Sequence, residues 1–440
     1  MESSHACLLL QASNLGHPDW WQQIKETGTP FIRQSSAVCY VDFFWQDPQG
    51  TEGESETVQV LLEVNSVTNH HSWTPRSLTR ISGTDVWHGV LELHPQWSGC
   101  YVFIPLTKDQ TPEYARKNSD GSEQAQRRWY LSVMNQAQAD PLNLNPGMVG
   151  SRDLDCSALH MPEAERIAAW QQWDEGELPV FNKSESLSFV WHSDLLDNER
   201  DICCFSTASE NQQQPLIILL DGQRWSHDSG MPSVLANLTA KGDLPGATYL
   251  LISSVDAAVR WAELSCSAAF WQAVLTELIP YLKSDGTLNF NEHDMTVAGQ
   301  SLGGLSALYA GLNWPEHVKK IVSLSGSFWW PNRYHKQLSA SQRKRIFPGS
   351  LTDLIARGVF FPDHLSAYLA VGDYEPEMID YNDLMVSWLV KAGSAVIYEK
   401  FCGGHDWLPW RSSLVKGLVA VHQPGSIDKC YGSLILKNRT

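Results

Sequence analysis

Hydrophobic and polar positions alternate over short runs in the first third of the chain. Four runs rich in Val, Tyr, Phe and Trp are separated by clusters of Asp, Gly, Pro and Ser, and they occupy residues 36–47, 57–65, 85–93 and 99–106. Such runs are typical of half-buried β-strands joined by turns. Short strands at regular spacing predict a β-sandwich in this part of the chain.

The pattern changes after about residue 184, where the apolar runs become continuous. Continuous apolar runs are expected where a strand is covered on both faces. They lie at residues 215–222, 247–256, 295–299, 320–327 and 366–373. The stretches between them include helical spacing at 267–283 and 302–313. Alternating strand and helix predicts a parallel sheet with helices on both faces.

A short helical or irregular connector over residues 161–179, which contains Pro162 and Pro179, separates the two patterns. The chain has 440 residues, more than the 100–200 or so of one ordinary domain. We therefore expect an N-terminal β-sandwich over residues 1–165, a linker over 166–184 and an α/β domain over 185–440.

Composition and charge narrow the class of protein. Hydrophobic residues make up 43% of the chain and charged residues 18%, and the formal net charge is -17. A negative chain without Lys/Arg runs is not expected to bind nucleic acid or an anionic membrane. The N-terminus lacks the basic and long apolar regions of a signal peptide, so a cytoplasmic location is expected.

Nine cysteines without a C-x-x-C pair predict reduced, mainly buried thiols. No spacing such as H-E-x-x-H suggests a metal site, and no cofactor is expected.

The strongest chemical signal is the segment "MTVAGQSLGGLSALYAGL", in which Gly299, Ser301 and Gly303 form G-x-S-x-G. A serine in this motif occupies a strained strand-to-helix turn at the carboxyl edge of the sheet. Glycines that end a strand before a serine helix cap would give the same letters. The apolar strand before the motif and the helical pattern after it favour a nucleophilic serine and an α/β-hydrolase fold.

A serine nucleophile needs an imidazole to accept its proton and a carboxylate to orient that imidazole. In this fold both follow the serine, the acid first. His405, in "GGHDW", is the expected base, and Glu375 is the expected acid, with Asp373 as the second choice. Asp406 is expected to shape the loop, since it adjoins the histidine.

The oxyanion of the tetrahedral intermediate needs preorganised N–H donors. The N–H of Leu302, directly after the serine, is expected to supply one. The segment "LLDGQRW" is expected to supply the other from Gly222 or Gln223, although an ordinary Asp-Gly turn would explain the same letters.

Several segments together resemble the enterobactin (enterochelin) esterases, serine hydrolases of catecholate-siderophore iron use. These segments are "LLDGQRW", R-x-x-E-L at Arg260, Glu263 and Leu264, "SLSGSFWWP" and "GGHDWLPWR", with "LTRISGTDVWHG", "YVFIP" and "ADPLN" in the N-terminal half. The resemblance covers most of the chain. It implies an accessory sandwich domain, and cleavage of the ester bonds of a cyclic trilactone, free or iron-loaded, by Ser301, His405 and Glu375.

A ferric tris-catecholate is a trianion with aromatic faces, so its site should offer cations and flat rings. Arg and Trp residues cluster on three expected site loops; those assigned to substrate binding are Arg224, Trp225, Trp329, Trp330, Arg333, Trp407 and Arg411. Any one cluster could instead be an aromatic ring packed under a solvated arginine. Arg76 and Arg80 of the first domain are expected at the solvated surface.

Two other functions remain open from the sequence. The same fold could cleave another aryl, feruloyl or thiol ester. The chain could also be a binding protein with an inert hydrolase domain, although the full set of Ser, acid and His favours an enzyme. The oligomeric state does not follow from the sequence.

Overall fold

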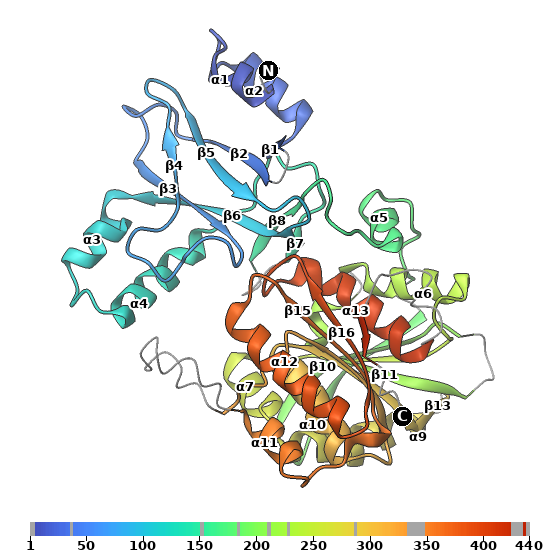
Figure 1. The fold of residues 1–440 in the computed structure, drawn as a ribbon. Coiled ribbons are helices and arrows are strands. Elements are labelled where there is room, and N and C mark those ends of the chain that lie inside the picture. The colour runs from blue at the N-terminus through green and yellow to red at the C-terminus, as the bar shows by residue number, and fades with distance from the viewer. Residues whose placement is uncertain are drawn as a thin grey trace. The chain divides into compact units, whose positions relative to one another are not determined.

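The computed structural model describes residues 5–35, 38–149, 154–182, 185–208, 213–226, 229–285, 288–331, 348–423 and 434–436. They form two compact units, drawn in Figure 1. Unit 1 comprises Met1–Glu165 and Cys402–Pro409, and unit 2 comprises Arg166–Phe401 and Trp410–Thr440. The sequence predicts domains over residues 1–165 and 185–440 that fold independently, and these boundaries stay a prediction. Within the described ranges, no helix has both the length and the apolar character needed to cross a membrane.

Unit 1 is built around eight antiparallel strands in the order β1-β2-β5-β4-β3-β6-β8-β7. The strands are β1 (Phe31–Ser35), β2 (Val38–Gln46), β3 (Thr57–Val64), β4 (Ser77–Arg80), β5 (Val86–Leu93), β6 (Ser98–Thr107), β7 (Met148–Val149) and β8 (Asp155–His160). The strands predicted from alternation correspond to β2, β3, β5 and β6. The strand-rich N-terminal domain is therefore confirmed.

The sheet of unit 1 folds back on itself. Phe43 on β2 and Tyr101 on β6 pack edge to face with ring centroids 5.0 Å apart, although three strands separate β2 from β6 in the sheet order. Two facing halves of this kind enclose a core as a sandwich does. Helices α2 (Pro18–Thr27) and α4 (Glu123–Val133) each pack buried apolar side chains against the strands, in two separate clusters.

Unit 1 also contains α1 (His5–Leu10) and α3 (Pro112–Lys117).

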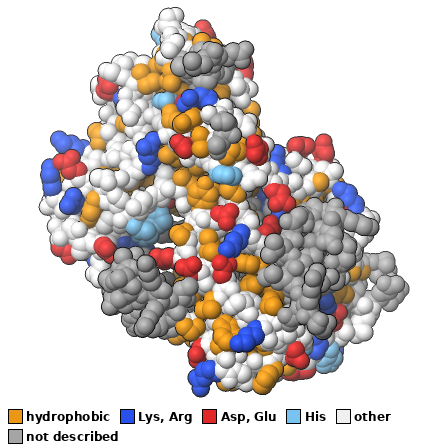
Figure 2. Space-filling view, in the orientation of Figure 1, with side chains coloured by type: hydrophobic (Ala, Val, Ile, Leu, Met, Phe, Trp, Pro, Cys, Tyr) orange, Lys and Arg blue, Asp and Glu red, His pale blue; other side chains and the backbone are white. Residues whose placement is uncertain are grey.

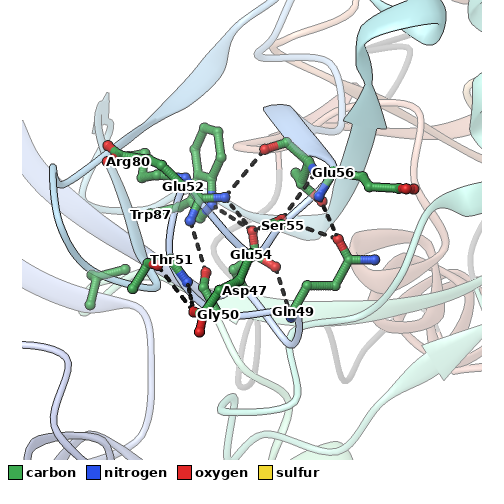
Figure 3. A network of polar contacts seen from close by, with 12 residues as sticks. Asp47, Gln49, Gly50, Thr51, Glu52, Glu54, Ser55, Glu56, Arg80 and Trp87 are labelled. Carbon is green, nitrogen blue, oxygen red and sulfur yellow. Dashed lines mark hydrogen bonds and ion pairs between the residues drawn. The ribbon is translucent and has the colours of Figure 1, made fainter.

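The loop between β2 and β3 is tied to the sheet by a buried ion pair (Figure 3). The carboxylate of Asp47 pairs with Arg80 and accepts a hydrogen bond from Ser55 Oγ at 2.7 Å. The Arg80 guanidinium lies over the ring of Trp87, 4.6 Å from its centroid. Since the Arg80 side chain is only 8% exposed, the expectation of a solvated surface arginine is wrong at this position.

Unit 2 has a nine-stranded sheet in the order β17-β16-β15-β14-β13-β11-β12-β10-β9. The strands are β9 (Ser186–Ser193), β10 (Asn198–Ser206), β11 (Gln214–Leu220), β12 (Thr248–Ile252), β13 (Phe290–Gln300), β14 (Val318–Leu324), β15 (Ser366–Gly372), β16 (Ala395–Phe401) and β17 (Leu434–Leu436). The six strands from β11 to β16 are parallel, whereas β9, β10 and β17 pair antiparallel at the edges. The parallel sheet expected from the sequence is confirmed for these six strands, and the antiparallel outer strands make the whole sheet mixed.

Helices flank this sheet (Figure 1). They are α5 (Ala168–Asp174), α6 (Met231–Lys241), α7 (Ala257–Leu264), α8 (Ala268–Ala273), α9 (Ile279–Asp285), α10 (Leu302–Asn313), α11 (Ser350–Ala356), α12 (Pro376–Lys391) and α13 (Trp407–His422). A π-helical turn over Val274–Leu278 joins α8 to α9, so the helix predicted at 267–283 is interrupted in its middle. The α/β fold and the alternation of strand and helix are confirmed.

The central strands are apolar along their length because both of their faces are covered. Residues 216–220 of β11, for example, are at most 1% exposed. Their carboxyl ends lead into the loops that carry the candidate site residues of unit 2, as is usual for open parallel sheets.

The surface carries mixed charge. On the face shown in Figure 2, Lys and Arg side chains occur singly or in small groups among Asp and Glu. Cys39, Cys100, Cys156, Cys203, Cys204, Cys266 and Cys402 are free thiols.

Candidate active site

Ser301 lies on a sharp turn between β13 and α10. Its backbone has φ 58° and ψ −117°, a left-handed conformation that is uncommon for residues other than glycine. The backbone N–H of Ser301 donates to the carbonyl of Leu324 on the neighbouring strand at 2.8 Å. A strained residue held by its surroundings is typical of a functional site, and this geometry is that of a nucleophile elbow.

Two of the surrounding glycines are required by close packing. A Cβ on Gly299 would lie 2.5 Å from the backbone of Gly303, and a Cβ on Gly304 would lie 2.5 Å from Ser323 Oγ. A Cβ on Gly303 would have its nearest neighbour at 3.6 Å, an ordinary contact. Gly299 and Gly304 therefore allow strand and helix to approach, whereas Gly303 is not sterically required.

The loop after β14 adds a second hydroxyl beside that of Ser301. Ser327 donates its N–H to the carbonyl of Ser301 at 3.0 Å, and the two Oγ atoms are 3.4 Å apart. The sequence analysis missed Ser327, because a serine in a loop has no distinguishing local pattern.

Glu375 follows the carboxyl end of β15 and is buried, with 6% of its surface exposed. One carboxylate oxygen accepts hydrogen bonds from Ser325 Oγ at 2.6 Å and from the N–H of Gly372 at 3.0 Å. Trp410 donates its indole N–H to the same Ser325 hydroxyl at 3.0 Å. Asp373, by contrast, is exposed. Burial and hydrogen bonding favour Glu375 as the oriented acid.

The candidate oxyanion loop follows β11. Asp221 adopts a left-handed conformation, with φ 56°, and the chain then makes a 3-10 turn over Gly222–Arg224. A Cβ on Gly222 would lie 2.6 Å from the backbone of Ile252, so only glycine fits there. Gln223 is exposed, and its side-chain oxygen accepts from the N–H of Ser254 at 3.0 Å. Leu302 stands at the first turn of α10, where N–H groups have no intrahelical acceptor.

Asp221 connects this loop to the elbow. Its carboxylate, in a residue only 2% exposed, accepts from Arg260 Nε at 2.6 Å and Nη2 at 2.7 Å, and from Gln300 Nε2 at 2.7 Å. Gln300 is the residue before Ser301. Burial lowers the pKa of Arg260, but hydrogen bonding and the charge of Asp221 outweigh it and raise that pKa. This network was not anticipated, since Asp221 had been interpreted as a turn residue.

His405 lies on the segment Cys402–Pro409, which belongs to unit 1. The carboxylate of the adjacent Asp406 accepts hydrogen bonds from the N–H groups of Cys100 at 2.6 Å and Leu408 at 3.3 Å. Burial raises the pKa of Asp406, and these backbone hydrogen bonds oppose the shift. Asp406 thus shapes the loop, as expected. Ser301 and Glu375 belong to unit 2.

A cavity of about 280 Å³ lies in unit 1. Its lining includes Glu63, Asn65, His70, Tyr130, His405 and Asp406. Pockets for drug-sized ligands begin near about 300 Å³, so the volume suits one ring-sized group.

The residues expected to bind substrate divide into two groups. Trp225 is 3% exposed and Arg411 is 7% exposed. The Arg411 guanidinium pairs with Asp174, with Nη1 2.9 Å from Oδ1, and lies 4.6 Å from the ring centroid of Trp170. These contacts do not fit the role expected for Trp225 and Arg411, because buried and paired side chains stabilise the fold and are not presented to a ligand.

The second group is accessible. Arg224, Trp329, Trp330 and Trp407 are partly exposed, whereas Arg333 lies outside the described residues. Trp261 on α7, which the sequence analysis did not assign to the site, is 36% exposed. Its ring centroid is 6.1 Å from that of Trp329, so the two rings form an aromatic pair.

The described residues include no group of three or more His, Cys, Asp and Glu that could hold a metal ion.

Known protein families match both parts of the chain. The family model described as enterochelin esterase, N-terminal, matches residues 40–170, and the Esterase family model matches residues 196–421. The iron(III) enterobactin esterase of Dickeya dadantii is 37% identical over 94% of this chain and 95% of its own length. The chain belongs to the iron(III) enterobactin esterase family.

Other members of the enterobactin esterase family are also similar to this chain over nearly its full length. The Escherichia coli K12 protein is 35% identical over 94% of this chain and 98% of its own length. The crystal structure of the Shigella flexneri enterobactin esterase, in the presence of enterobactin, has a TM-score of 0.78, with 34% identity over 93% of this chain and 99% of that one. The chain is therefore an esterase with the α/β fold of this family.

Proposed function

We propose that this esterase hydrolyses the ester bonds of enterobactin-type catecholate trilactones, and that it does so in the cytoplasm. The observation that carries the proposal is the left-handed Ser301 elbow at the carboxyl edge of the sheet. Near full-length similarity to iron(III) enterobactin esterases supplies the substrate class. Ser301 is the nucleophile, His405 the base and Glu375 the acid.

The reaction begins when Ser301 Oγ attacks the ester carbonyl carbon while His405 accepts the hydroxyl proton. The N–H of Leu302, with that of Gln223 or Gly222, stabilises the oxyanion that forms. Collapse of the intermediate breaks the ester bond, and the protonated His405 gives its proton to the leaving alkoxide oxygen of the substrate serine, which becomes a hydroxyl. Water then attacks the acyl-enzyme with His405 as base, which releases the acid and restores Ser301.

Glu375 would orient the imidazole and stabilise its protonated form. The hydrogen bonds from Ser325 and Gly372 support this role, because they hold its carboxylate in one position.

Recognition of the catechol rings would rest on the accessible Trp and Arg side chains. Trp329 and Trp261 offer a tilted pair of aromatic rings, and Arg224 offers a cation; we also include Trp330, Trp407 and Arg333. Trp225 and Arg411 are left out because they are buried.

The test compares hydrolysis of ferric trilactone, apo trilactone and a simple aryl ester by the wild type and by Ser301→Ala. The proposal expects a preference for a trilactone, and loss of turnover with substrate binding retained in the variant. Turnover by Ser301→Ala would refute the nucleophile. A preference for the aryl ester would favour the same fold acting on other esters.

A further inference from the structure

The loop that carries His405 is packed against the strands of unit 1. The chain leaves β16 at Phe401 and enters unit 1 at Cys402. There the carbonyl of Cys402 accepts a hydrogen bond from the N–H of Ser98 at 3.1 Å. The proposed base is therefore held by the N-terminal half of the chain, although it lies far along the sequence.

Both backbone polar groups of His405 are bound by consecutive side chains of unit 1. The N–H of His405 donates to Ser66 Oγ at 3.1 Å, and its carbonyl accepts from Asn65 Nδ2 at 3.3 Å. Ser66 Oγ donates in turn to Asn65 Oδ1 at 2.8 Å. Asn65 is itself fixed to the sheet, since its N–H donates to the carbonyl of Cys100 at 3.0 Å.

The fit between this turn and the loop is close enough to require glycine. A Cβ on Gly404 would lie 2.2 Å from Ser66 Cβ, which is impossible without movement of one segment. Ser66 has φ 59°, a strained conformation for a serine. The turn is thus held in a conformation that brings its hydroxyl to the backbone of His405.

Asp406 fixes the other side of the base. It is 2% exposed, and its carboxylate accepts the N–H of Cys100 on β6 at 2.6 Å. The residue before His405 and the residue after it are therefore both in contact with strands or turns of unit 1.

We propose that Asn65, Ser66 and Asp406 are positioning residues, through which the N-terminal unit sets the orientation of the His405 imidazole. The inference rests on the proposed role of His405 as base. It assigns the accessory unit a part in the chemical step in addition to any part in substrate binding. A displacement of about 1 Å at a catalytic group can cost about 100-fold in rate, so loss of these hydrogen bonds should lower kcat more than it raises KM.

The experiment uses the full chain with Ser66→Gly and Asn65→Ala, singly and together. Glycine adopts φ 59° without strain, so Ser66→Gly removes the hydroxyl without disfavouring the turn. Asp197→Gly is the matched control, since Asp197 also has a positive φ, of 50°, and lies in the turn between β9 and β10. Each variant is then made in a His405→Ala background.

We expect the double variant to lower kcat about 10- to 100-fold and to slow fluorophosphonate labelling of Ser301 similarly, while KM and the control change little. In the His405→Ala background the same substitutions should have no further effect, because there is no imidazole to position. Unchanged kcat would overturn the proposal, as would an equal loss with and without His405. If Ser301→Ala still turns over the trilactone, the proposed function fails instead.

Discussion

The packing around the elbow makes opposite predictions for two glycines of one motif. Gly299→Ala should destabilise the protein and abolish reactivity of Ser301, because the new methyl group meets the backbone of Gly303 at 2.5 Å. Gly303→Ala should be tolerated, since its methyl group meets nothing nearer than 3.6 Å. Both substitutions add one methyl group, and the two positions are only four residues apart in the chain.

The magnitudes follow from the two environments. Forcing an extra methyl group into a packed site costs about 1–3 kcal/mol, and the upper end applies to Gly299 because the obstacle is backbone. Gly303 lies in α10, where alanine is favoured over glycine by up to about 1 kcal/mol. The free energies of unfolding of the two variants should therefore differ by about 2–4 kcal/mol.

Urea unfolding measures this difference, and fluorophosphonate labelling reports whether Ser301 keeps its geometry. The expected result is a lower unfolding midpoint and no labelling for Gly299→Ala, with a wild-type or higher midpoint for Gly303→Ala. Equal damage by the two substitutions would refute the steric reasoning. So would wild-type stability of Gly299→Ala.

Three further predictions follow from other parts of unit 2. Arg260→Met should lower the free energy of unfolding by about 2–3 kcal/mol, because it leaves the Asp221 carboxylate buried without its cation. Urea unfolding should show a smaller loss of this free energy when Asp221→Asn is added to Arg260→Met. Equal losses in the single and the double variant would contradict the ion-pair argument. Burial, aided by the charge of Lys320 and opposed by that of Asp294, lowers the pKa of His422 from 6.5 to about 4. As the pH falls, this histidine is therefore protonated in the unfolded chain before it is protonated in the folded one. The free energy of unfolding should drop between pH 6.5 and 4, by at most about 3 kcal/mol. His422→Gln should remove this part of the acid sensitivity in unfolding measurements at several pH values, and an unchanged profile would count against it. Trp261→Ala should raise KM for the trilactone with little loss of stability, because its ring is 36% exposed and pairs with Trp329; steady-state kinetics with an unchanged KM would exclude Trp261 from recognition.

The central strands of unit 2 could be predicted from the sequence because burial on both faces makes them continuous apolar runs. The outer strands could not. β10 lies between β12 and the edge strand β9, and its sequence "NERDICCFS" mixes charged and apolar residues, since the strand is only partly buried. β16, next to the edge strand β17, also has a mixed burial pattern.

The elbow at Ser301 was predictable because strand, motif and helix are contiguous in sequence. Contacts between distant segments were not. Arg411 is paired with Asp174, which lies 237 positions away, and an Arg beside a Trp has the same local pattern whether it faces a ligand or a buried carboxylate. Likewise, the hydrogen bond from the N–H of His405 to Ser66 spans 339 positions, so no local spacing indicates it.

The most direct test of the central claim is to trap the acyl-enzyme. The protein is mixed with enterobactin, quenched in acid during turnover, digested and analysed by peptide mass spectrometry. We expect the ring-opened trilactone, or a shorter dihydroxybenzoyl-serine ester formed in later turnovers, as an adduct on the peptide that contains Ser301, and none in Ser301→Ala. An adduct on a different residue, or full turnover by the alanine variant, would contradict the account.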